Sequence, residues 1–550
     1  MKRLKRTLAV LIGTLLLSIA YAHEGEDHGE QELVGGRVLG TIHFPTTTES
    51  EAAQDAFIRG MLLLHLFEYP FAEEEFRRAR EIDPDFVMAY WGEAMTHNHP
   101  IWDEQDPEKA YAVLQVLGAS PEARQSKTSS QKEKDYLAAL DVLYGDGDAA
   151  GKARRDREYM RHMGQMALDY PDDHEVQLFH ALALIGTSAG VRDIPTYMES
   201  TAISQRVFYA NREHPGAAHY LIHGVDDPVH APLGLEAARA LAVMAPDAGH
   251  SLHMTSHIFT AVGLWEDVVV ANIEAARVAN AMRAEQGQPH RSYGHYNYWL
   301  LYGLLQQGRY DEAEALLRSA YREITEAGYV PEDPLQLVPE RSDVGSVVRM
   351  WSRFLLESKS AGHAVPTDLR AWTFTMGEAF DPLTRWHFTR AYLAPDAESA
   401  AGHHAEFRRV AEALKVAILA LDRQAPGDLL YLDRLAVMDH QLLAAQARMK
   451  GDTEAAIEHA READRLEGEM PFSFGPPFVD VPSAELLGDL LLAAGQNDAA
   501  AEAYTTALER ARLKAQPLLG LSKAETARGN QAAADYAMAQ YRQVRASEDG

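Results

Sequence analysis

Histidine is the residue type in this chain whose number and spacing point most directly to chemistry. The sequence contains 24 histidines and no cysteine, and seven of the histidines lie in residues 214–257. Two pairs, His219/His223 and His253/His257, are each separated by four residues. On a helix this spacing places both rings on one face, about one turn apart. Neutral imidazole binds zinc, copper and iron, so each pair is a candidate part of a transition-metal site.

The two pairs are also related to each other. His253 follows His219 by 34 residues, and His257 follows His223 by 34. A fixed interval predicts equivalent positions on consecutive units of a repeating fold, whose helices pack roughly 10 Å apart. We therefore predict that the four rings point into one cavity and hold one divalent zinc, copper or iron ion, with His250 as a further ligand.

Other side chains fall at positions that are expected to face the same groove. His65 and His99 are again 34 residues apart, and His295 opens the next unit. The predicted groove-lining residues are His65, His99, Asp226, His295, Tyr298 and Tyr302.

A purely structural role for the histidines stays open at this point, because buried rings also cap helices, stack on aromatic side chains or form neutral hydrogen-bonded networks. The chain has no His-Glu-x-x-His pattern, no serine-centred elbow and no phosphate-binding glycine loop. We therefore predict neither a zincin protease nor a nucleotide cofactor.

The elements that must position these residues are helices. Alanine-rich amphipathic segments recur along the chain, separated by short turns of glycine, proline or aspartate. In residues 60–84 the spacing of small residues, phenylalanine and proline resembles the tetratricopeptide repeat, a 34-residue helix–turn–helix unit, and the pattern returns in residues 488–534. The predicted fold class is an all-α, tetratricopeptide-type right-handed helical solenoid with long inter-repeat loops, in which each unit buries its apolar face against its neighbours.

Four strings resemble a family of exported bacterial tetratricopeptide-repeat proteins, and the similarity covers nearly the whole chain after the leader. They are MAYWGEAM at 88–95, HPGAAHYLIH at 214–223, AGHSLHMTSH at 248–257, and GPP at 475–477 before ELLG at 485–488. The two histidine strings are the most specific part of the similarity. The resemblance implies the fold and export from the cytoplasm but no particular activity.

The N-terminus has the pattern of a signal peptide. Lys2, Arg3, Lys5 and Arg6 precede an apolar run, and Ala20-Tyr21-Ala22 fits a cleavage site. We predict residues 1–22 as a signal peptide, a periplasmic or secreted location, and no membrane insertion after cleavage. Cleavage there would leave His23 first, with an amine and a ring that together can chelate copper.

The predicted domain organisation follows the clarity of the repeats. It comprises an N-terminal arm at 23–48, N-terminal helical repeats with a histidine-lined groove at 49–324, degenerate helical repeats at 325–430, and C-terminal tetratricopeptide repeats at 431–550. An aromatic, proline-rich segment at 467–483 interrupts the last part. In water such a segment must pack on something, either over a groove or as a connector between repeats.

Net charge restricts the partners. The chain carries −29 at pH 7, which repels nucleic acids and anionic lipid surfaces. The predicted function is a scaffold that binds a protein, peptide or small-molecule ligand in its concave groove, with a histidine-coordinated metal. The alternative is a hydrolytic or oxidative metalloenzyme with its active site in the same groove.

Overall fold

The fold is an all-α solenoid of paired helices, as the sequence predicted. The computed structural model describes residues 36–145, 147–148, 151–188, 191–328, 335–337, 342–421 and 426–545. The predicted signal peptide, His23 and the first part of the predicted arm lie outside these residues. The sheet content of the described chain is one antiparallel pair, β1 (Asn98–His99) with β2 (Glu104–Gln105).

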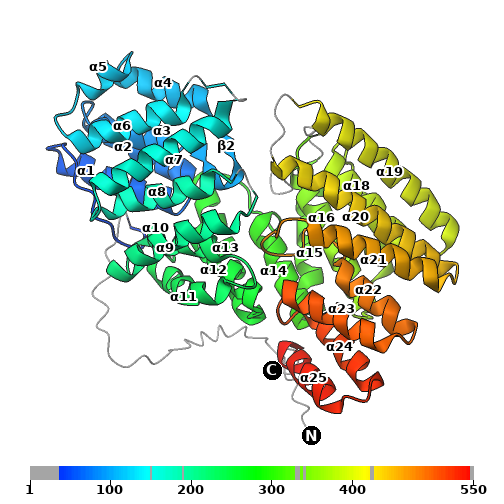
Figure 1. Ribbon diagram of the computed structural model, residues 1–550. Helices are drawn as coiled ribbons and strands as arrows, with labels where there is room; N and C mark the ends of the chain where they lie inside the picture. The colour runs from blue at the N-terminus through cyan, green and yellow to red at the C-terminus, as the bar shows by residue number, and fades with distance from the viewer. Residues whose placement is uncertain are drawn as a thin grey trace, which may run out of the picture.

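The N-terminal group of helices carries the histidine pairs (Figure 1). Its elements are α1 (Glu51–His65), α2 (Tyr69–Ile82), α3 (Val87–Met95), η1 (Pro100–Trp102), α4 (Pro107–Leu117), α5 (Pro121–Gln125), α6 (Gln131–Tyr144), α7 (Lys152–Asp169), α8 (His174–Gly186), α9 (Ile194–Ala210), α10 (Pro215–Val225), η3 (Ala231–Gly234), α11 (Leu235–Met244), α12 (Gly249–Val262) and α13 (Trp265–Glu285).

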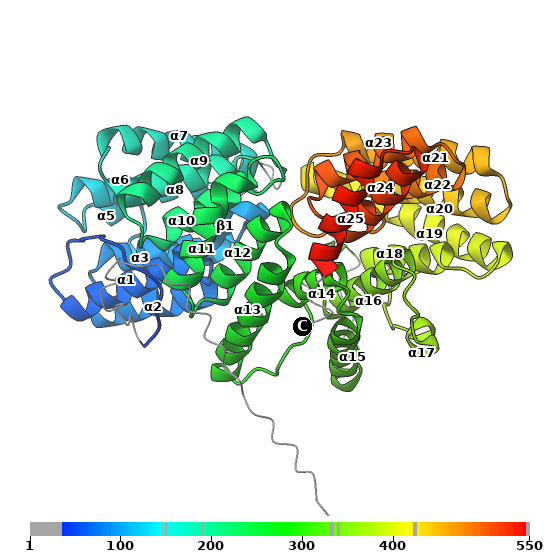
Figure 2. The same ribbon diagram turned by 90° about the horizontal axis from the view of Figure 1, so that it is seen from below.

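The C-terminal group begins at α14, which lies between the two groups in both views (Figures 1 and 2). Its elements are α14 (His295–Gln307), α15 (Tyr310–Ala327), α16 (Asp343–Ser360), α17 (Thr367–Ala371), α18 (Phe380–Tyr392), α19 (Ala397–Leu419), α20 (Pro426–Met449), α21 (Thr453–Glu469), α22 (Ser483–Ala493), α23 (Asn497–Arg510), α24 (Ala515–Ala527) and α25 (Gln531–Arg545). The predicted boundary between residues 430 and 431 falls inside α20, and the domain division stays a prediction.

Close packing of glycine against an aromatic ring explains the repeat pattern at both ends of the chain. The ring of Phe76 on α2 lies between Gly60 on α1 and Gly92 on α3, and Tyr504 on α23 lies likewise between Gly488 on α22 and Gly520 on α24. A Cβ at Gly92 would meet a ring carbon of Phe76 at 2.3 Å. In these two units the second helix of a pair (the B helix) inserts one ring between consecutive first helices (the A helices), and the glycines leave room for that ring.

This packing predicts opposite effects for two glycine substitutions. Gly92→Ala is expected to lower the free energy of unfolding by about 1–3 kcal/mol, because the buried ring must move. Gly402 is exposed inside α19 with nothing within 4 Å of a built Cβ, so Gly402→Ala is expected to raise it by up to about 1 kcal/mol through helix propensity. Urea denaturation followed by circular dichroism measures both. A Gly92→Ala protein as stable as the parent would contradict the packing.

An extended segment and the C-terminal helices hold the histidine helices from outside. In the described part of the predicted arm, Leu39 and Phe44 are buried, and the Thr41 N–H donates to the Glu213 carbonyl at 3.0 Å. On the other side, the Trp265 indole N–H donates to the Leu513 carbonyl at 2.7 Å. The solenoid thus curls back until the segment before α24 touches α13. Among the described residues, no helix is long and apolar enough to span a bilayer.

Candidate metal centre

Helices α10 and α12 carry the two histidine pairs, and local sequence signals fix where each helix begins. His214 caps α10 by accepting the Ala217 N–H at its Nδ1 atom. Glu68 caps α12 from another helix pair, because its carboxylate accepts the His250 N–H at 3.0 Å. Gly263 ends α12 in the left-handed region with φ 79°, a conformation that glycine adopts without strain. These capping interactions therefore fix where the two histidine pairs lie along α10 and α12.

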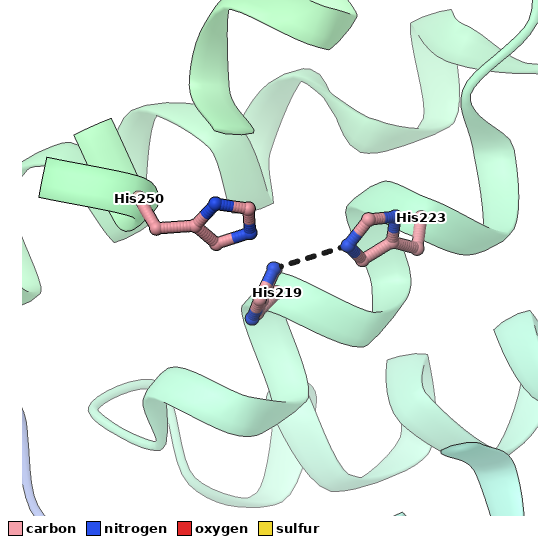
Figure 3. Close-up of side chains that lie close together, drawn as sticks. All are labelled: His219, His223 and His250. Atoms are coloured by element: carbon pink, nitrogen blue, oxygen red, sulfur yellow. Dashed lines mark hydrogen bonds between the residues drawn. The ribbon is translucent and has the colours of Figure 1, made fainter. Parts of the chain in front are cut away.

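His219, His223 and His250 form the first triad (Figure 3). One ligand nitrogen from each ring lies within 4.8 Å of the others, and the Nε2 atoms of His219 and His223 are 3.1 Å apart. His250 enters from the first turn of α12. Its Nε2 atom is buried and has no hydrogen-bond partner among the described residues.

His253, His257 and His295 form the second triad, built by the same rule. Their ligand nitrogens also lie within 4.8 Å of one another, and the Nε2 atoms of His253 and His257 are 3.0 Å apart. His295 is the first residue of α14. In both triads, an i, i+4 pair on one helix is completed by a histidine from the first turn of the next A helix.

The prediction of one cavity around one ion therefore needs correction. Each pair already brings its own two Nε2 atoms together, so the two pairs do not combine their four nitrogens at one point. The triads nevertheless adjoin, because the ring centroids of His223 and His257 are 6.3 Å apart, as are those of His250 and His253. His250 is a member of the first triad, and His295, predicted only to line the groove, belongs to the second.

Hydrogen bonds fix the tautomers of the second triad. His257 Nδ1–H donates to the Asp226 carboxylate at 2.5 Å. His253 Nδ1 lies 2.7 Å from the side-chain oxygen of Asn272, whose NH₂ group is turned to the Val268 carbonyl. His253 must therefore also donate from Nδ1. With Nδ1 as the protonated nitrogen of each ring, both facing Nε2 atoms carry lone pairs.

The first triad is oriented by the backbone. His219 Nδ1–H donates to the His65 carbonyl at 2.6 Å, so its Nε2 atom also presents a lone pair. A metal-bound histidine almost always donates its other N–H to a carbonyl or carboxylate in this way, which fixes the ring and raises its basicity. His219, His253 and His257 all have such a partner.

Burial favours the neutral form of four of these rings. Burial lowers the pKa of His219 from 6.5 to about 3 and lowers the pKa values of His223, His250 and His253 well below 6.5. A metal ligand must be the unprotonated imidazole. His219, His223, His250 and His253 therefore present neutral nitrogen donors at neutral pH without displacing protons.

A third group, His65, Glu175 and His214, has metal-ligand residue types but a different chemistry. The Glu175 carboxylate lies 2.7 Å from His65 Nε2 and 3.0 Å from His214 Nε2. Since His214 Nδ1 accepts a backbone N–H, its Nε2 atom carries the proton and donates to Glu175. His65 Nδ1 faces the Tyr220 hydroxyl at 2.9 Å. Hydrogen bonds satisfy the ring nitrogens of this group, and the backbone carbonyl of His65 accepts from His219.

Phe67 covers the first triad. Its ring centroid lies 4.4 Å from that of His219 and 5.7 Å from those of His223 and His250. Its backbone has φ 57°, which is costly for a residue with a side chain. Sequence periodicity gave no sign of this residue. The strain is consistent with a position fixed by its contacts with the three rings.

Trp299 and Phe474 cover the second triad. Trp299 stacks on His257 with centroids 4.2 Å apart, and Phe474 lies 5.3 Å from the same ring. A Cβ at Gly475 would meet the Trp299 ring at 2.2 Å. The aromatic segment between α21 and α22 therefore covers the histidines, and the groove predicted to be lined by them is filled at this place.

The remaining predicted residues lie outside the triads. Tyr298 and Tyr302 face α16, where Arg353 Nε donates to the Tyr298 hydroxyl at 3.1 Å and its guanidinium lies over the Tyr302 ring. His99 stacks on Tyr69 with centroids 4.0 Å apart and donates from Nε2 to the Thr96 carbonyl. Asp226 and His65 act as hydrogen-bond acceptors behind the ligands.

The donor sets fit a divalent transition metal. Two nitrogens on a tetrahedral zinc ion lie about 3.3 Å apart for bonds of about 2.05 Å, close to the 3.0 and 3.1 Å found within the pairs. Three imidazoles without thiol suit zinc, copper or iron. An orphaned nitrogen on His250 and the facing lone pairs of His253 and His257 are both features that a bound cation would satisfy.

Comparisons with known proteins give no family. No family model matches the chain, and no curated protein matches it. Among solved structures it is similar to the human IFIT1 dimer with m7Gppp-AAAA (14% identity, 84% of this chain and 90% of that chain, TM-score 0.32), to Cut9 of the APC/C hetero-tetramer Cut9-Hcn1 (11%, 90% and 74%, 0.32) and to yeast Tom70 (12%, 90% and 91%, 0.26). Because identities and TM-scores are this low, these structures say nothing about what this chain binds.

Proposed function

We propose that this chain is an exported helical-repeat scaffold whose histidine triads bind a divalent transition metal: zinc, copper or iron. The observation that carries the proposal is the pair of Nε2 lone pairs of His253 and His257, which face each other at 3.0 Å while both Nδ1–H groups are committed elsewhere. A metal ion between the two rings would accept both lone pairs. A protein, peptide or small-molecule ligand held by the solenoid remains part of the proposal.

A metalloenzyme is the second candidate, and the donor count favours it. Each triad supplies three nitrogens, the number found in catalytic zinc sites that keep one position open. Against it stand the burial of five of the six rings, with His295 half-buried, and the aromatic side chains packed over both triads. Phe67 and Trp299 pack directly on the rings, so metal binding within a scaffold is the better-supported function.

Metal titration of the full chain, stripped with a chelator, tests the proposal. We expect tight binding of Zn²⁺, measured by calorimetry, and a loss of at least about 100-fold in affinity for the His253→Ala/His257→Ala variant, because removing ligands costs more than altering their partners. The matched control is His440→Ala/His459→Ala, which removes a partly exposed pair with its Nδ1 atoms 3.4 Å apart.

The control distinguishes a built site from surface histidines. We expect the His440→Ala/His459→Ala protein to bind as the parent does. Absence of tight binding to the parent, or equal binding by the two double variants, would overturn the proposed function. Circular dichroism of each variant confirms that the helices are intact.

A further inference from the structure

The two triads differ in what stands behind them. In the first, the acceptor for a ligand N–H is a neutral backbone carbonyl, that of His65, at 2.6 Å from His219 Nδ1. In the second, one acceptor is the carboxylate of Asp226, at 2.5 Å from His257 Nδ1. A carboxylate behind a ligating imidazole makes the ring a stronger donor and offsets part of the metal's charge.

Asp226 also joins the two triads physically. It follows the end of α10, three residues after the first-triad ligand His223, yet it accepts from the second-triad ligand His257. Its side chain is buried, and its second oxygen, Oδ1, has no hydrogen-bond partner among the described residues. A buried carboxylate therefore lies between the end of α10, which carries the pair of the first triad, and the second-triad ligand His257.

The backbone around Asp226 is held in place by an arginine. Arg192 donates to the carbonyls of His223 and Gly224 at 3.1 and 2.7 Å, and it pairs with the Asp227 carboxylate at 2.7 Å. Asp227 thereby neutralises Arg192 and leaves the charge of Asp226 for the histidines. The segment from His223 to Asp227 is thus fixed by groups other than the triads themselves.

From these contacts we propose that the protein holds two metal ions in unequal sites, a tight one at His253, His257 and His295 and a weaker one at His219, His223 and His250, with Asp226 as the positioning residue that makes the difference. This inference rests on the proposed metal-binding function. The repeat explains why there are two sites, since each A-helix pair takes its third ligand from the next A helix. The next such helix, α14, has Tyr298 and Tyr302 where another histidine pair would be needed, so the series ends there.

The two triads use different rings, because no histidine belongs to both. The ring centroids of His223 and His257, and those of His250 and His253, are 6.3 Å apart. A two-metal site instead holds its ions roughly 3.5–4 Å apart. The pair is therefore two neighbouring mononuclear sites, which predicts two separate spectroscopic signatures.

The experiment titrates the chelator-stripped full chain with Zn²⁺ alone by calorimetry, and separately loads it with Cu²⁺ alone for electron paramagnetic resonance. Asp226→Asn keeps an oxygen that accepts from His257 Nδ1–H but removes the charge. We expect two ions per parent chain, a 10- to 100-fold loss of affinity in Asp226→Asn at the tighter site only, and a change in one of two Cu²⁺ spectral components. Asp247→Asn is the control, because Asp247 accepts from the Val38 N–H and touches no triad.

Variants of single ligands assign the two metal-binding events to the two triads. His253→Ala should abolish the tighter event and His219→Ala the weaker one. One ion per chain, two ions of equal affinity, or an Asp226→Asn protein with unchanged affinities and spectra would overturn this inference while leaving metal binding standing. No tight binding at all would overturn the proposed function as well.

Discussion

The metal-free protein is expected to lose stability steeply as the pH falls from 6.5 towards 4. Five buried histidines have pKa values lowered by burial: His214, His219, His223, His250 and His253. Below pH 6.5, the unfolded chain binds a proton at such a group and the folded chain does not. The stability is therefore complete above the unfolded pKa and is lost as the pH falls towards the folded one.

The magnitude follows from the one value that is resolved. With a pKa of about 3 in the folded state and 6.5 unfolded, His219 alone removes about 2 kcal/mol of stability at pH 5. The other four histidines act in the same direction. Since domains are typically stable by about 5–15 kcal/mol, the sum is expected to unfold the helices around α10 and α12 in mild acid.

Urea denaturation in the presence of a chelator at pH 7.5, 6 and 5 measures this loss. The comparison is a His219→Gln/His253→Gln variant, whose amides cannot titrate, and its stability should depend less on pH than that of the parent. Equal unfolding free energies at pH 7.5 and 5 for the parent would show that the rings are not buried in their neutral form.

The helices and the histidine pairs were predictable from the sequence because both follow periodic rules. A spacing of four places His253 and His257 on one helix face, and the 34-residue interval places them in register with His219 and His223. The glycines that contact Phe76 and Tyr504 are also regularly spaced, because Gly60 and Gly92 are 32 residues apart and so are Gly488 and Gly520. The helices and the histidine pairs agree with the sequence-based prediction because local geometry determines both.

The partition into two triads was not predictable in the same way. It depends on which ring completes each pair, and that is set by how far the first turn of the next helix reaches. The 34-residue interval between equivalent helix positions is also lost beyond α12, because α13 runs for 21 residues. As a result Trp299, rather than Tyr298 or Tyr302, faces His257.

No local sequence pattern predicts the aromatic side chains that pack over the histidines. Phe67 adopts a left-handed backbone that no periodicity indicates. Phe474 reaches His257 from a distant segment whose two possible roles the sequence left open. Contacts of this kind arise from the closure of the whole solenoid, so their signal is spread over the chain.

A buried network of arginine and aspartate side chains holds the segment that carries Phe474. Breaking this network is expected to lower the stability of the protein strongly. Asp480 accepts both bonds from Arg385 Nη1, at 2.5 and 2.6 Å, with both side chains almost fully buried. Arg353 donates to the carbonyls of Pro477 and Asp480 at 2.9 and 2.8 Å. Arg385 also pairs with Asp381, which pairs with Arg434. The charges alternate along this network, so each guanidinium depends on its carboxylate neighbours.

Asp480→Ala is expected to lower the free energy of unfolding by about 3–5 kcal/mol, because it removes one of the two carboxylate partners of the buried Arg385 guanidinium. Asp498→Ala, which removes an exposed partner of Arg528, should cost no more than about 1 kcal/mol. Urea denaturation compares the two variants, and hydrogen exchange of residues 470–482 reports the segment itself. Since Phe474 and Gly475 lie on His257 and Trp299, faster exchange there in Asp480→Ala should accompany faster release of metal from the second triad. If Asp480→Ala matched Asp498→Ala in stability and in hydrogen exchange, the arginine–aspartate network would not be what holds residues 470–482 over the histidines.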